Sequence, residues 1–182
     1  MAIATASPST QERAGAVTFK GSPLTAIGPA IPVGAKAPDF QVLAQDLSLI
    51  TLAHFTGRPV LISSVPSLDT PVCDAQTRRF NEEAAQLSNV AILTVSMDLP
   101  FAQKRWCGAA GINRVTVVSD HKDASFGKAY GTLIKELRLL ARAIFIVDAG
   151  GVARYVEYVP EIASHPNYDT ALAAARQLTT GA

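Results

Sequence analysis

Two cysteines are the residues of this sequence best suited to covalent chemistry. Cys73 and Cys107 are its only cysteines, and they stand 34 positions apart in a chain of 182 residues. A thiolate attacks oxidants and disulfides, and two thiols can complete one oxidation by forming a disulfide. The pair therefore indicates redox chemistry, with two inert core thiols as the alternative.

The surroundings of Cys73 favour a reactive thiol. We predict a buried strand at residues 60–65 and a helix over residues 71–87, with Pro71 near the preferred first helical position. The partial positive charge at a helix N-terminus stabilises a thiolate in the first turn. Phe80, Ala84 and Leu87 form an apolar stripe on the face of Cys73, so a small core residue is the other interpretation.

The loop before this helix carries a second polar candidate. Thr70 stands three residues before Cys73, where its hydroxyl could hydrogen-bond the sulfur or a peroxide oxygen, or cap the helix instead. Pro66 and Pro71 restrict the same loop and would keep a pocket in shape before substrate arrives.

Cys107 occupies a different helical position. It lies near the end of a predicted helix starting at Pro100, with Gly108 and Gly111 just beyond, so this helix end could loosen. A disulfide needs Cα atoms within about 7 Å. Either the reduced fold brings the two cysteines close or the helices move, and we expect movement.

The remaining elements alternate in a recognisable order. The hydrophobic pattern predicts the following segments: a hairpin of residues 17–20 and 24–27, strands at 40–44, 47–52, 90–96 and 115–118, helices at 100–110 and 125–130, a hairpin of 143–147 and 152–158, and a last helix at 169–178. A βαβ unit followed by a β-hairpin and a terminal helix is the order of the thioredoxin fold. We therefore predict an α/β thioredoxin-like fold, with a mixed central sheet flanked by helices and an N-terminal β-hairpin.

Length and composition predict one soluble domain. We assign residues 17–182 to it and residues 1–16, which lack the pattern of a cleaved signal, to a flexible N-terminal extension. A net charge of +1 and strand-length apolar runs suggest neither nucleic acid nor membrane as a partner. Two cysteines in a chain of this size favour a cytoplasmic location.

Other site classes find little support. His54, His121 and His165 are scattered, and neither cysteine has a neighbour at zinc spacing, so we expect no metal. Phosphate-binding loops and the serine-hydrolase elbow are also missing from the sequence.

Three segments of the sequence resemble a known family. The segment from Pro66 to Cys73 resembles the Pro-x-x-x-Thr-x-x-Cys active-site loop of peroxiredoxins. With residues 98–108 and 140–148, it is similar to the bacterial thiol peroxidase group of atypical two-cysteine peroxiredoxins. The resemblance runs from about residue 17 to the C-terminus.

This resemblance implies a thiol-dependent antioxidant peroxidase that needs no cofactor. Cys73 would be the peroxidatic cysteine, activated by Thr70 and Arg142, which with Pro66 would also form the substrate pocket. Cys107 would be the resolving cysteine. The family pattern further implies hydrogen peroxide and alkyl hydroperoxides as substrates, an intramolecular Cys73–Cys107 disulfide, thioredoxin as reductant and a homodimer.

Arg142 also has a physical rationale. A permanently charged guanidinium stabilises a nearby thiolate and donates to a peroxide oxygen as charge develops there. An exposed arginine at a strand edge is the alternative.

Two other functions are compatible with the same fold. A thiol-disulfide oxidoreductase usually carries Cys-x-x-Cys, and Thr70 occupies the first of those places here. A non-enzymatic binding domain would leave Cys73 buried and inert.

Overall fold

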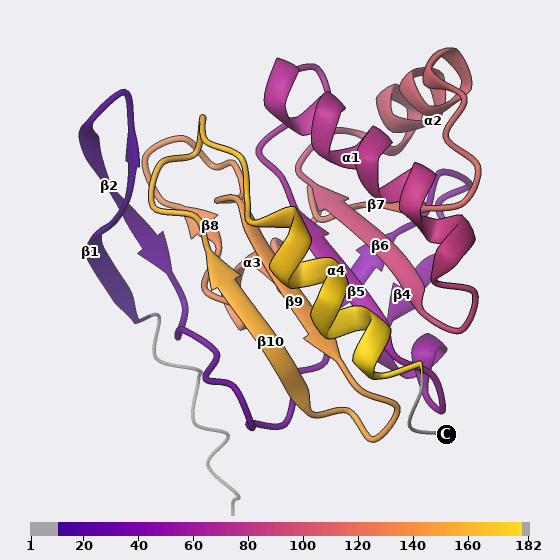
Figure 1. The fold of residues 1–182 in the computed structure, drawn as a ribbon. Coiled ribbons are helices and arrows are strands. Elements are labelled where there is room, and N and C mark those ends of the chain that lie inside the picture. Colours follow the sequence, from indigo (N-terminus) through magenta and orange to yellow (C-terminus); the bar gives the residue numbers. More distant parts are fainter. Residues whose placement is uncertain (1–10, 180–182) are drawn as a thin grey trace, which may run out of the picture.

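Two sheets organise the chain, seen here in a computed structural model that describes residues 11–179 (Figure 1). The larger sheet has seven strands in the order β10-β9-β5-β6-β7-β3-β4. Its members are β3 (Gln41–Leu43), β4 (Leu49–Thr51), β5 (Val60–Ser64), β6 (Ala91–Ser96), β7 (Thr116–Ser119), β9 (Ala143–Val147) and β10 (Ala153–Tyr158). β5, β6 and β7 run parallel, whereas β9 pairs antiparallel with both β5 and β10. The predicted mixed central sheet is confirmed.

Helices cover both faces of this sheet. Strand side chains alternate between faces, so Leu61 and Ile146 join one buried cluster with side chains of α1 (Pro71–Glu83), α2 (Pro100–Ala110) and α4 (Tyr168–Gln177). Ile62 and Phe145 join another with α3 (Ser125–Ala129). In Figure 1, α4 lies across the front of the sheet and α3 lies behind it.

Most predicted boundaries hold within a few residues. The bounds of α2 and β9 agree with the prediction, and α3 stops one residue earlier than expected, before Gly131. The helix predicted over residues 71–87 is shorter: α1 ends at Glu83, and a 3-10 turn, η2 (Ala84–Gln86), continues it. A second 3-10 turn, η1 (Leu52–Phe55), precedes β5.

The second sheet adds support to one end of the domain. β1 (Glu12–Phe19) and β2 (Ser22–Ile27) form the predicted antiparallel hairpin, and β8 (Leu133–Ile134) pairs with β2. β8 was not predicted. Residues 12–16, which we assigned to the extension, belong to β1 instead, while residues 1–10 lie outside the described part.

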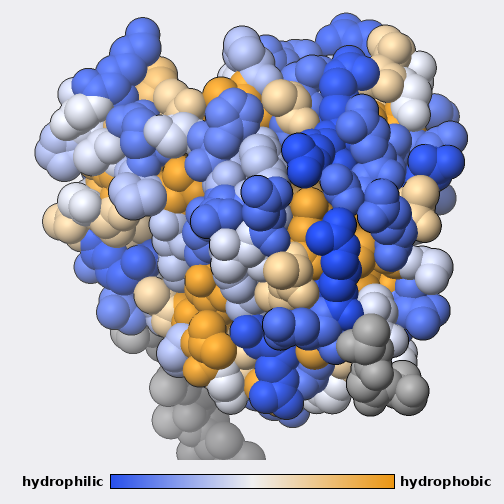
Figure 2. All heavy atoms as spheres, viewed as in Figure 1, coloured by the Kyte–Doolittle hydropathy of each residue, from blue (hydrophilic) through white to orange (hydrophobic). Residues whose placement is uncertain are grey.

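The surface is mainly polar where α4 and β10 face the viewer. Figure 2 shows small, separated apolar groups on that side rather than one continuous patch. Within residues 11–179, no helix combines the length and apolar character needed to cross a membrane.

Candidate active site

The loop between β5 and α1 presents Cys73 and Thr70. Cys73 lies in the first turn of α1 and its side chain is fully buried. The loop is fixed by Asp98, which follows β6: its carboxylate accepts hydrogen bonds from Ser67 Oγ at 2.7 Å and from Leu68 N at 2.9 Å. These bonds hold the start of α1 against the end of the central strands.

Thr70 turns its hydroxyl toward the sulfur. Oγ1 lies 2.7 Å from Cys73 Sγ and 2.9 Å from the Ser67 carbonyl oxygen, and it does not cap the backbone of α1. Because a hydroxyl has one proton, it can donate to a thiolate, or accept from a thiol while donating to Ser67. The site therefore accommodates both protonation states of Cys73.

Arg142 approaches the same sulfur from the start of β9. Its Nη2 donates to Cys73 Sγ across 3.2 Å, and the side chain is 1% exposed. The exposed strand-edge alternative is therefore wrong. The structure brings together the three residues that the sequence singled out, although they are separated by up to 72 positions.

The charge of Arg142 has an unusual set of partners. Its guanidinium donates to Gln76 Oε1 at 2.6 Å and, from Nε and Nη2, to the Ile162 carbonyl at 3.2 and 2.8 Å. Across residues 11–179, no carboxylate forms an ion pair with it. A buried cation is costly without a counter-charge, and a Cys73 thiolate would supply one.

Gln76 and Ile162 were missed by the sequence reasoning. Gln76 is fully buried on the Cys73 side of α1, where its Nε2 donates to Ser63 Oγ at 2.7 Å while its Oε1 accepts from Arg142. An amide on the otherwise apolar face of a helix was the available signal. Ile162 contributes only its backbone carbonyl, so side-chain type carried no information about it.

Pro66 shapes the loop and lies at its beginning. It is buried directly after Val65, whose N–H donates to the Val95 carbonyl at 3.0 Å, and it begins the loop that leads to Thr70. With no N–H of its own, it shapes the backbone and offers no hydrogen-bond donor.

Cys107 lies in α2 with different neighbours. It is 6% exposed, it shares a core cluster with Cys73, and both cysteines are free. Its Sγ accepts a 3.2 Å hydrogen bond from Gln45 Nε2. Burial raises the pKa of the Cys107 thiol, and the Gln45 hydrogen bond only partly opposes this shift. The expected movement before disulfide formation remains a prediction.

Comparison with known proteins supplies the family. Residues 32–172 match the Redoxin family model. The chain belongs to the Redoxin family. Among curated relatives, the thiol peroxidase of Halalkalibacterium halodurans is 59% identical, over 88% of this chain and 96% of that protein. The thiol peroxidase of Bacillus subtilis is 56% identical, over 89% and 97%. These matches place the chain among the thiol peroxidases of the family.

Solved structures share this fold. A peroxiredoxin-like protein from Aquifex aeolicus superposes with a TM-score of 0.84 at 43% identity, covering 89% of this chain and 96% of that one. A thiol peroxidase from Chromobacterium violaceum shares the fold with a TM-score of 0.79 at 22% identity, covering 91% and 98% of the two chains.

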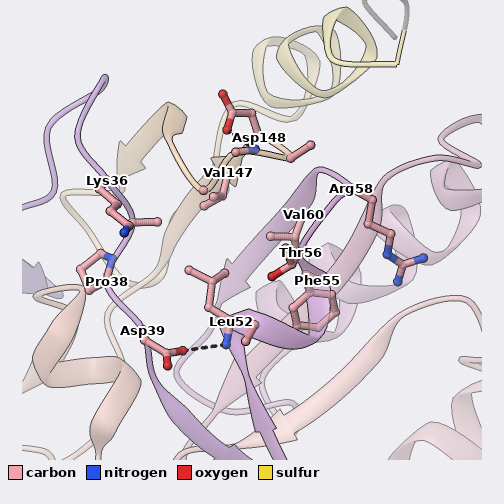
Figure 3. A pocket seen from close by; sticks show the side chains of 15 residues that line it. Lys36, Pro38, Asp39, Leu52, Phe55, Thr56, Arg58, Val60, Val147 and Asp148 are labelled. Carbon is pink, nitrogen blue, oxygen red and sulfur yellow. Dashed lines mark hydrogen bonds between the residues drawn. The ribbon is translucent and has the colours of Figure 1, made fainter.

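A cavity of about 620 Å³ lies elsewhere in this Redoxin-family fold (Figure 3). Figure 3 shows Lys36, Pro38 and Asp39 along one side of it, and Leu52 and Phe55 along another. The cavity adjoins the beginning of β5, whereas Cys73 follows the end of that strand. It is therefore separate from the cysteine site.

Proposed function

We propose that this protein reduces hydroperoxides, with Cys73 as the attacking thiolate and Cys107 as the resolving thiol. The observation that carries the proposal is the buried contact between Arg142 and Cys73. A fixed cation without a carboxylate partner in the described chain favours a negative charge on the sulfur beside it. Thr70 adds a second donor to that sulfur.

In the first step, the Cys73 thiolate attacks one oxygen of the peroxide. An S–O bond forms, the O–O bond breaks, and the departing oxygen takes up a proton to leave as water or an alcohol. Cys73 becomes a sulfenic acid. Arg142 and Thr70 donate toward the reacting atoms, where negative charge moves from sulfur to oxygen.

In the second step, Cys107 resolves the sulfenic acid. Its sulfur attacks Cys73, an S–S bond forms, and the sulfenic oxygen leaves as water with the proton of the Cys107 thiol. Both sulfurs are buried, and Cys107 is held by Gln45, so we expect α2 to move when the bond forms.

Thioredoxin would close the cycle. A dithiol donor reduces the Cys73–Cys107 disulfide by exchange and is itself oxidised to a disulfide. The resemblance to two-cysteine peroxiredoxins favours thioredoxin as this donor and the reducing cytoplasm as the compartment.

A homodimer completes the proposal. Leu99 is 55% exposed and Phe101 65% exposed, both at the start of α2 and next to Asp98, which fixes the active-site loop. Two exposed apolar side chains beside the site are consistent with the family's pairing of subunits there.

The test is peroxide consumption with thioredoxin, thioredoxin reductase and NADPH. We expect hydrogen peroxide and an alkyl hydroperoxide both to be consumed, Cys73→Ser to be inactive, and Cys107→Ser to react once without forming the internal disulfide. Peptide mapping should find Cys73 bonded to Cys107 in the oxidised wild type. Disulfide exchange without peroxide consumption would instead support a thiol-disulfide oxidoreductase.

A further inference from the structure

Gln45 is a polar side chain that the proposed cycle does not yet use. It lies in the loop between β3 and β4, and its Nε2 donates to Cys107 Sγ at 3.2 Å. The contact joins residues 62 positions apart and links the edge of the large sheet to α2. Within residues 11–179, Gln45 is the side chain that hydrogen-bonds the Cys107 sulfur.

The loop that carries Gln45 is a compact, self-contained turn. Asp46 Oδ1 accepts from Ser48 N at 2.9 Å and from Ser48 Oγ at 2.6 Å, and Leu47 N donates to the Ala44 carbonyl. Leu47 has a φ of 70°, a left-handed conformation that disfavours a leucine. These local bonds hold the backbone of the turn that carries Gln45.

The β3–β4 hairpin is joined to the β-ladder of the sheet at a single point, while Val42 of β3 packs into the buried core. β4 is an edge strand, and β3 pairs with β7 through one residue pair, Leu43 with Ser119. The Gln45–Cys107 bond and the attraction between Asp46 and Lys104 connect the hairpin to α2. The hairpin and α2 can therefore separate without breaking the central strands.

We propose that Gln45 is a positioning residue that retains Cys107 in its buried place and has to release it before the disulfide forms. This inference rests on the proposed function and concerns its second step. There, the Cys107 sulfur bonds to Cys73 and the sulfenic oxygen departs as water. The N–H···S bond exists only before that movement.

Whether loss of Gln45 speeds or slows disulfide formation depends on the state in which the Gln45–Cys107 hydrogen bond exists. A hydrogen bond to sulfur in the closed fold stabilises the reactant and contributes nothing to the open form from which Cys107 attacks. Burial raises the pKa of the Cys107 thiol in the closed fold, and the Gln45 hydrogen bond only partly opposes this shift, so leaving that place favours ionisation of the thiol. Loss of Gln45 should therefore accelerate resolution. If Gln45 instead activated Cys107, loss of Gln45 would slow resolution.

The experiment uses the full-length protein and its single tryptophan, Trp106, which adjoins Cys107. After mixing with hydrogen peroxide, stopped-flow fluorescence should resolve sulfenic acid formation and then disulfide formation. Gln45→Met keeps the length of the side chain but removes the donor. We expect an unchanged first phase and a second phase about two- to five-fold faster, as for the loss of one weak hydrogen bond.

Hyperoxidation offers an independent measurement. A second peroxide converts the Cys73 sulfenic acid to sulfinic acid in competition with resolution. Faster resolution in Gln45→Met should lower the sulfinic fraction at high peroxide, measured by intact mass. Gln41→Met, the same change at an exposed position of β3, is the matched control and should behave as wild type. Gln45→Ala repeats the comparison with a shorter side chain.

The outcomes separate this inference from the proposed function. A wild type that forms the Cys73–Cys107 disulfide, together with Gln45 variants whose second phase is unchanged or slower, would overturn the role of Gln45 alone. A wild type that consumes peroxide without forming that disulfide would overturn the resolving step and this inference with it.

Discussion

Arg142 donates from Nη2 to Cys73 Sγ across 3.2 Å, inside a site where the arginine side chain is 1% exposed. Its other hydrogen-bond partners in the described chain, Gln76 and the Ile162 carbonyl, are neutral. The sulfur is thus the contacting group that can become an anion by losing a proton. In the proposed function, this one contact would both balance the buried charge of Arg142 and activate Cys73 as the nucleophile.

Replacing Arg142 by methionine should nearly abolish the peroxide step. The substitution removes the cation beside Cys73 and a donor to the reacting atoms, so we expect kcat/KM for hydrogen peroxide to fall about 100- to 1000-fold. Arg142→Lys keeps a charge without the planar fork and should be intermediate. Arg154→Met, on an exposed arginine of β10 that pairs with Asp148 at the opposite end of β9 from Arg142, is the control. Stopped-flow measurements within threefold of wild type for Arg142→Met would contradict the assignment.

Thr70 should act through its hydroxyl and not its shape. Thr70→Val keeps the branched side chain but removes the 2.7 Å contact with Cys73 Sγ, and the rate of sulfenic acid formation should fall about 10- to 100-fold. Thr70→Ser retains the hydroxyl and should stay close to wild type. Equal rates for the valine and serine variants would exclude the hydrogen bond as the cause.

The sequence was informative where chemistry or periodicity was local. Two hairpins could be predicted because turn residues separate short apolar runs, and α2 because Pro100 and Gly111 mark its ends. Thr70 and Cys73 lie within one loop and helix turn, so their proximity followed from spacing. Arg142 needed the family resemblance, since nothing in its own neighbourhood indicates that it turns inward.

What could not be predicted depends on contacts between distant segments. β8 has two residues, too few for any period, and it exists because β2 offers an edge to pair with. Gln45 meets Cys107 only because β3 joins the sheet beside β7. The N-terminal hairpin was predicted, but its contact with the site was not: the Thr18 carbonyl accepts from Ile162 N beside Arg142.

Gln76 should matter for stability as well as activity. Gln76→Leu preserves bulk but removes a buried hydrogen-bond partner from Ser63 and one of those of Arg142, so the free energy of unfolding should fall by about 1–3 kcal/mol. Urea denaturation of the reduced protein measures this difference. Gln86→Leu, on an exposed residue of η2, controls for the chemical change. If Gln76→Leu is as stable as wild type, the hydrogen-bond chain does not support the fold.

Asp120 should make stability depend on pH. Burial raises the pKa of Asp120 to about 6, although its carboxylate accepts from Phe126 N and Gly127 N. The folded state therefore binds the proton more tightly than the unfolded state, whose Asp120 has its ordinary value near 3.8. This contribution is complete below about pH 4 and lost as the pH rises through about 6, a change of roughly 3 kcal/mol.

Comparison with Asp120→Asn isolates that contribution from other titrating groups. The difference in unfolding free energy between wild type and the variant should change between pH 4 and pH 7, in the direction of a relatively less stable wild type at pH 7. A constant difference across this range would mean that Asp120 has the same pKa folded and unfolded.

Glu161, which follows β10, should link the N-terminal hairpin to the active site. Its carboxylate accepts hydrogen bonds from Thr18 Oγ1 at 2.9 Å and from the N–H of Gly21 at 3.2 Å, and the next residue, Ile162, gives its carbonyl to Arg142. Glu161→Ala should loosen the hairpin and speed amide hydrogen exchange at Gly21. The rate of the reaction with peroxide should fall about two- to five-fold, the effect expected when one hydrogen bond that positions Arg142 is weakened. Arg142 would keep its direct bond to the sulfur, so the loss must be smaller than in Arg142→Met.

The pH dependence of this hairpin contact has the opposite sign to that of Asp120. Burial raises the pKa of Glu161, but hydrogen bonds from Thr18 and Gly21 outweigh it, so the net shift is downward. The carboxylate therefore stabilises the hairpin above its ordinary pKa near 4.5, and this stabilisation is lost as the pH falls through the lowered value. The protection of the Gly21 amide, measured as its exchange rate relative to the intrinsic rate at each pH, should therefore fall in acid in the wild type but not in Glu161→Ala. An equal loss of protection in both proteins would show that another group ties the hairpin to the segment beside Arg142.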